Sequence, residues 1–243
     1  NAHLADDAAN SDEIAAGAID LAHMSVNSID SDQYVDGSID SAHLASGAAA
    51  SAIDDLSDAT TASTSNVGLG STSLDSVSGG NYNTAVGINA GTAVTSGDDN
   101  VFIGFEAGDA TTDVDKAIII GSGAAGANMT SAADGTIAIG YNASAAQTDG
   151  LRTLAIGHGA LDAADSGEDD CIAIGFDAMG NLNTDGAIRN IVIGNYAGDG
   201  MGTVGASTDN IFIGHDSGGG TWTTAVSFGN IGIGSYTLDA AMN

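Results

Sequence analysis

The chain has 243 residues, and its composition excludes several classes of protein. A formal net charge of −29 with only three basic residues leaves no basic patch for the phosphates of nucleic acid or for an anionic membrane surface. There are 36 glycines, no proline, one cysteine and no apolar run long enough to span a bilayer. The absence of proline fits a chain in which almost every backbone N–H joins a hydrogen-bond ladder.

Residues 1–55 repeat with a period of ten, built from two pentads. An apolar residue at every fifth position matches neither the helical period of 3.6 nor the strand period of 2. One chain with so few apolar side chains can bury little apolar surface by itself. We therefore expect a shaft in which several chains wind together. His3, His23 and His43 lie on this period and are interpreted as a structural ladder rather than a metal site. Residues 56–65 form the junction with the next region.

Residues 66–243 contain a second repeat of ten units, each 17–20 residues long. Each unit has a small polar residue, often Asn, then three residues rich in Ile, Val and Ala, then a glycine. We expect this glycine to make a tight corner or to adopt a positive φ. The glycines are Gly70, Gly87, Gly104, Gly121, Gly140, Gly157, Gly175, Gly194, Gly214 and Gly234.

The residues one and three positions before each glycine are aliphatic in 19 of 20 cases, which predicts one apolar face of a short strand. We expect this face to be the core. Its ladder would comprise Ile103, Ile120, Ile139, Ile156, Ile174, Ile193, Ile213 and Ile233.

The position between the two aliphatic columns carries no charged residue, so the second face of the strand is also predicted to be covered. Because a solenoid coil has one interior, we assign this second cover to another chain. The predicted inter-chain contacts are Phe102, Ile119, Val192 and Phe212.

The length of the repeat unit distinguishes between the known repeat architectures. Propeller blades need about 40 residues or more, and the leucine-rich pattern is absent. Coils of 17–20 residues fit two short strands and two corners, which predicts an all-β, parallel β-roll or β-solenoid. With strands about 4.8 Å apart, ten coils would make a rod of roughly 45 Å. The small residue three positions after each glycine is expected where one turn stacks on the next.

Two resemblances follow from these repeats. The units "NTAVGINAG", "NVFIGFEAG", "TIAIGYNAS" and "NIVIGNYAG" resemble the head repeats of trimeric autotransporter adhesins, which implies a left-handed parallel β-roll wound by three chains. The segment "GAIDLAHMSVNSIDSDQYVDGSIDSAHLASG" is similar to short repeats of tail-fibre and other appendage proteins of marine bacteriophages. Adhesin heads have a shorter and more uniform period, which favours the phage fibre.

Acidic clusters raise the question of catalysis. Glycoside hydrolysis needs two carboxylates held in a cleft, whereas Asp98-Asp99, Asp113 with Asp115, and Glu168-Asp169-Asp170 lie in expected loops and are interpreted as solvated turns. No metal ligands are assigned, although the carboxylate and carbonyl oxygens of such loops are the donors that Ca²⁺ prefers. Cys171 replaces the repeated asparagine of its unit and is interpreted as an inert variant. The repeated asparagines are expected to bond to turn backbone, stacked on one another.

Together these observations predict a homotrimeric, non-enzymatic fibre segment of a phage tail or surface appendage, located on a virion or outside a cell. Its partners would be itself, other virion or appendage proteins, and a host receptor or glycan, with no nucleic acid and no membrane insertion. Alternatives are a bacterial trimeric adhesin head, a polysaccharide-degrading tail spike and a monomeric solenoid that binds ions or ice. No cofactor is expected.

Overall fold

The computed structural model describes residues 59–60, 65–183, 186–203, 207–220 and 228–239. They belong to one compact unit, Ala50–Asn243. The decapeptide repeats of 1–55, with His3, His23 and His43, lie outside the described residues.

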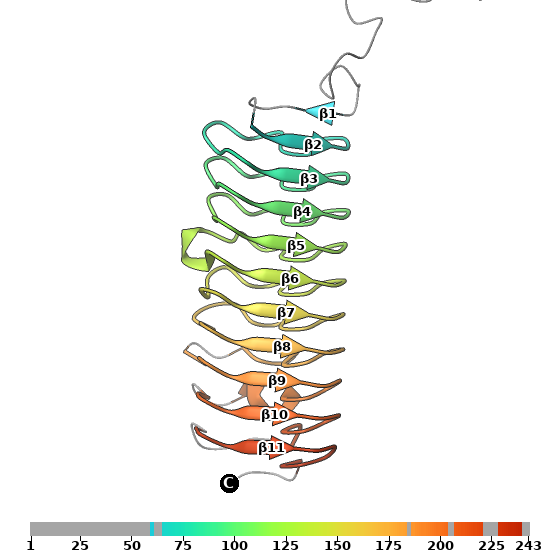
Figure 1. Cartoon of the computed structure of the whole chain (residues 1–243), viewed down its shortest axis with the longest axis vertical. Helices are drawn as coiled ribbons and strands as arrows, with labels where there is room; N and C mark the ends of the chain where they lie inside the picture. Colours follow the sequence, from blue (N-terminus) through green and yellow to red (C-terminus); the bar gives the residue numbers. More distant parts are fainter. Residues whose placement is uncertain (1–58, 61–64, 184–185, 204–206, 221–227, 240–243) are drawn as a thin grey trace, which may run out of the picture. The chain divides into compact units, whose positions relative to one another are not determined.

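The described residues form a parallel β-solenoid in which each coil contributes one strand (Figure 1). The eleven strands pair in chain order, parallel from β2 onward, and β1 pairs antiparallel to β2. The ten parallel strands fall on the ten predicted units. The strands are β1 (Ala59–Thr60), β2 (Val67–Leu69), β3 (Thr84–Val86), β4 (Val101–Ile103), β5 (Ile118–Ile120), β6 (Ile137–Ile139), β7 (Leu154–Ile156), β8 (Ile172–Ile174), β9 (Ile191–Ile193), β10 (Ile211–Ile213) and β11 (Ile231–Ile233).

The repeat glycines make the corner that follows each strand, as predicted. Their φ angles lie between +120° and +143°, in a region that favours glycine. The corners also stack tightly, because a Cβ added at Gly104 would lie 2.7 Å from the carbonyl oxygen of Gly121 in the next coil. Glycine is therefore required twice, for the backbone angle and for the approach of neighbouring coils.

The remainder of each coil differs from the expected second strand. Among the described residues it consists of turns, with two short 3₁₀ segments, η4 (Ser131–Ala133) and η5 (Asp199–Thr203). Backbone hydrogen bonds still join successive coils here; for example, Gly91 N–H donates to Ala107 O at 2.9 Å, and Gly108 N–H to Ala124 O at 2.9 Å. Residues with positive φ interrupt this side, and an extended strand cannot contain them.

The two faces of the strands are reversed relative to our prediction. The residues expected between chains, Phe102, Ile119, Val192 and Phe212, are fully buried within one chain, at 0% exposure. The expected core ladder lies on the outward face and is half-buried or exposed: Ile103, Ile120, Ile139, Ile156, Ile174, Ile193, Ile213 and Ile233. The period of two correctly groups residues by face, but it does not identify which face is inward. The narrow coil takes the column with more Ala and Gly inside.

The interior is filled by pairs of residues six positions apart. Phe102 packs against the turn at Gly108, where an added Cβ would lie 2.5 Å from the ring. Ala155 is paired instead with the large Leu161, and all four of these residues are buried. In these coils a large residue thus faces a small one, whereas Ala85 with Gly91 is a small pair whose space is taken by the Phe102 ring of the next coil. Other pairs are Gly68 with Leu74, Ala173 with Met179, Val192 with Gly198, and Phe212 with Gly218.

Asparagine side chains before the strands form the expected ladder. Asn100 Nδ2 donates to Val114 O in its own turn at 2.7 Å and to Asn83 Oδ1 in the preceding coil at 2.9 Å. Asn210 Nδ2 donates in the same way to Asn190 Oδ1 at 2.9 Å. The ladder therefore satisfies buried polar groups of both the turn and the neighbouring coil.

Candidate functional site

The outward face of the strands is the first candidate for an interaction surface. We call it the aliphatic face; it consists of the residues one and three positions before each corner glycine, 19 of 20 of them aliphatic. Ile118 is 37% exposed, Ile103 38% and Ile193 36%. With strands about 4.8 Å apart and three residues long, the face covers roughly 450 Å² in projection. Apolar patches of this size on soluble proteins are commonly functional.

A second surface is formed by side chains that follow the corner glycines in six successive coils. They are stacked along the axis, with ring centroids 4.9 to 5.9 Å apart, a separation typical of aromatic contacts. We call this row the aromatic ladder: Tyr141, His158, Phe176, Tyr196, His215 and Tyr236.

The aromatic ladder was not predicted from the sequence, although a signal is present. In the last six coils an aromatic or His residue stands one or two positions after the glycine. The rings are well exposed; Tyr141 is 53% exposed, Tyr196 41% and Tyr236 60%. Aligning the positions after the glycine, rather than those before it, would have found them.

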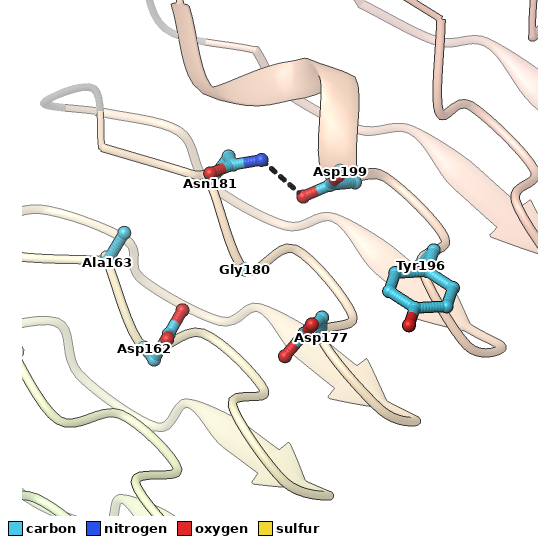
Figure 2. Close-up of a pocket in the computed structure, with 7 residues that line it drawn as sticks. All are labelled: Asp162, Ala163, Asp177, Gly180, Asn181, Tyr196 and Asp199. Atoms are coloured by element: carbon cyan, nitrogen blue, oxygen red, sulfur yellow. Dashed lines mark hydrogen bonds between the residues drawn. The ribbon is translucent and has the colours of Figure 1, made fainter.

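A pocket of about 350 Å³ lies beside the ladder and spans three coils (Figure 2). Asp162 follows β7, Asp177 follows β8, and Asp199 begins η5 after β9, while Tyr196 stands at the border of the pocket. Ala163, Gly180 and Asn181 complete the lining, and Asn181 Nδ2 donates to Asp199 Oδ1 at 2.5 Å. None of these residues was singled out from the sequence, because the pocket joins loops that are distant in the chain.

Burial and mutual repulsion disfavour the ionised form of two carboxylates in the pocket. Partial burial raises the pKa of Asp162, and the nearby charge of Asp177 raises it further. Burial likewise raises the pKa of Asp199, again with a contribution from Asp177. His158 Nδ1 lies 3.9 Å from Asp177 Oδ1. The pocket therefore favours a ligand that brings positive charge.

The acidic clusters found in the sequence contribute to the stacking of coils. Asp98 Oδ1 accepts the backbone N–H of Asn81 at 2.6 Å, and Asp115 Oδ1 accepts that of Asp98 at 2.8 Å. Asp169 Oδ1 accepts the N–H of Leu151 at 2.7 Å. The interpretation as solvated turns is wrong for Glu168, which is fully buried at 0% exposure.

Two of the three basic residues join neighbouring coils through paired hydrogen bonds to aspartate. Arg152 Nε and Nη2 donate to the two carboxylate oxygens of Asp170 at 2.7 and 2.9 Å. Arg189 contacts Asp209 in the same way, at 2.6 and 2.9 Å. Each guanidinium lowers the pKa of its aspartate. These pairs are exposed, so water and salt weaken them.

Cys171 has the environment of an unreactive thiol. It is fully buried, and its Sγ donates to Ala187 O at 3.2 Å while Asn190 Nδ2 lies 3.8 Å from the sulfur. Burial raises the pKa of the thiol to about 11. Because the thiolate is the nucleophile, such a group has little reactivity at neutral pH.

Within the part of the chain that the structure describes, no three His, Cys, Asp or Glu side chains are grouped closely enough to hold a metal ion. In the same residues no helix has the length and apolar character needed to cross a membrane. The fold defines the class of the described region as a parallel β-solenoid. Comparisons with protein families, with curated proteins and with solved structures found no match.

Proposed function

We propose that this chain is a structural fibre segment of a bacteriophage tail or comparable surface appendage, assembled from three copies. In this role it gives reach and stiffness on a virion or outside a cell, presents its loops for attachment to a host, and needs no catalytic group. The observation that carries the proposal is the aliphatic face. The resemblance of the repeats to fibre and adhesin repeats supports the number of copies and the biological setting.

The aliphatic face supports self-association because its chemistry is opposite to that of the rest of the sequence. The chain has 32 acidic residues, yet none occurs in the two columns of the face. A fully exposed isoleucine loses roughly 1.5–3 kcal/mol relative to full burial, and the half-buried isoleucines of this face lose a part of that. A second copy of this chain offers the same strand spacing and the same apolar surface, so the two faces match coil by coil.

In a trimer around a common axis, the aliphatic face of each copy is turned toward the other two copies. A closed ring of identical contacts stops growth sideways, whereas the stacked coils already provide length along the axis. This arrangement keeps the acidic loops outside, where solvent and salt screen their repulsion. It also replaces our earlier assignment of Phe102 and Phe212 to the inter-chain contact, since both rings are buried in their own chain.

The mass of the protein in solution tests the proposal. Light scattering after size-exclusion chromatography should give three times the chain mass of 23.6 kDa. A mass of one chain, unchanged on raising the protein concentration, would contradict the proposal.

Strand β5 offers a matched pair of variants because all three of its residues are isoleucine. Replacing the outward Ile118 and Ile120 by Thr should weaken the trimer, and Thr84 already occupies the same column in β3. Six altered side chains per trimer, each losing about 0.8 kcal/mol or more, should lower the association constant on the order of a thousandfold. I119T changes the buried residue between them and should instead lower the temperature of unfolding. Equal effects of both variants on assembly would refute the role of the aliphatic face.

A further inference from the structure

The rings of the aromatic ladder contact one another from coil to coil, yet they remain exposed beside the acidic pocket, and this combination indicates a ligand. We propose that they form a binding site for a cationic saccharide, an oligomer of amino sugars with free ammonium groups. This inference rests on the proposed function, because it names the chemistry of the host surface to which the fibre attaches.

The pocket has the size and polarity of a site for a small organic group. Its volume of about 350 Å³ lies at the lower end of the range for ligand pockets, roughly 300–1,000 Å³. Asp162, Asp177 and Asp199 enter it from three successive coils, and Asn181 adds an amide (Figure 2). Carboxylates and an amide held apart in this way can accept and donate hydrogen bonds at several positions of a sugar ring.

The charge of the site selects a cation larger than a metal ion. In the described residues the carboxylates are not grouped closely enough to hold a metal. An ammonium group carried on a sugar can reach separated carboxylates, because its three N–H donors point in different directions. It would offset the repulsion among Asp162, Asp177 and Asp199. The protein as a whole, with a net charge of −29, also attracts a polycation.

The aromatic ladder extends the site along the axis. Tyr196 belongs both to the pocket and to the ladder, with ring centroids 5.3 Å from Phe176 and 5.9 Å from His215. Exposed aromatic rings attract ammonium groups and cover the apolar C–H faces of sugars. A linear oligomer can therefore place one ammonium in the pocket and contact further rings in neighbouring coils.

The test uses the full chain and a glucosamine oligosaccharide with free amines, compared with its N-acetylated counterpart of equal length. Calorimetric titration should detect binding of the free-amine oligomer, with at least tenfold weaker binding of the N-acetylated one. D177N and Y196A should each lower the affinity at least tenfold.

Matched controls come from the first two coils. Asp75 stands five positions after its corner glycine, as Asp162 does, and is exposed; Tyr82 is 69% exposed and lies outside the ladder. D75N and Y82A should leave the affinity unchanged. All four variants should retain the mass of the unaltered protein, so failure to bind with an intact trimer overturns this inference alone.

Three results would overturn the inference. The first is equal binding of the two oligomers, which would remove the role of the ammonium group. The second is equal binding of an oligolysine peptide with the same dependence on Asp177 and Tyr196, which would make the site a general cation surface. The third is loss of the trimer in Y196A, which would assign the ladder to contacts between copies.

Discussion

The alternation of large and small residues in the core predicts that two damaging substitutions compensate each other. Phe102 fills its coil and Gly108 leaves space for it, whereas Ala155 is paired with Leu161. F102A should cost about 3–5 kcal/mol, the usual range for removing a buried ring. G108L alone should cost about 2–5 kcal/mol, from overpacking against the ring and from the strain of a side chain at positive φ.

In the double variant F102A/G108L, the leucine occupies the space that the ring has left. Leucine already adopts this backbone conformation in another coil, because Gly108 has φ of +59° and Leu161 has φ of +54°. We expect the double variant to lie within about 2 kcal/mol of the unaltered protein, and hence a favourable coupling of about 3 kcal/mol or more. Denaturant unfolding followed by far-ultraviolet circular dichroism, at one protein concentration, measures the free energies.

The control combines F102A with G218L. Gly218 lies against the ring of Phe212 in another coil. These sites do not touch, so their costs should add. If F102A/G108L is also as unstable as the sum of its single variants, the idea that Phe102 and residue 108 share one interior space is refuted.

Four further outcomes are expected. Cys171, with its pKa raised to about 11, should resist a thiol reagent at pH 7 until the protein unfolds, and fast labelling of the folded protein would contradict its burial. N100A should lower stability by about 2–4 kcal/mol, because Val114 O and Ala117 N–H lose their partner; a change below 0.5 kcal/mol in thermal unfolding would contradict the ladder. G104A should abolish soluble folded protein, and recovery of stable protein would show that the corners can separate. Because the folded pKa of Asp162 is raised, its ionisation opposes folding as pH rises; D162N should therefore be more stable at pH 7, with the difference vanishing as pH falls toward the unfolded pKa near 3.8.

The sequence predicts the repeat well because the same constraint acts in every coil. Glycine at the corner and asparagine before the strand are each fixed by local geometry, so their columns are visible in one chain. The orientation of the strands was predicted wrongly for a different reason. Both faces are apolar, and only the pairing of residues six apart, such as Phe102 with Gly108, identifies the inner column.

The pocket could not be predicted because it depends on the lengths of loops. Asp162, Asp177 and Asp199 are not equally spaced in the chain, and only the stacked coils bring them together. Glu168 shows the same difficulty: an acidic residue in a loop is expected in water, but the stacking buries it. Side chains placed by contacts between variable loops leave no periodic signal.

Each coil bonds almost exclusively to the coil before it and the coil after it, through continuous glycine and strand columns. A whole unit can therefore be duplicated or lost in the gene without disturbing the register of those that remain. The length of the rod is open to change by gain or loss of its similar units, while loops that differ from coil to coil change independently. Such a scaffold can adjust its reach and its contact surface in separate evolutionary steps.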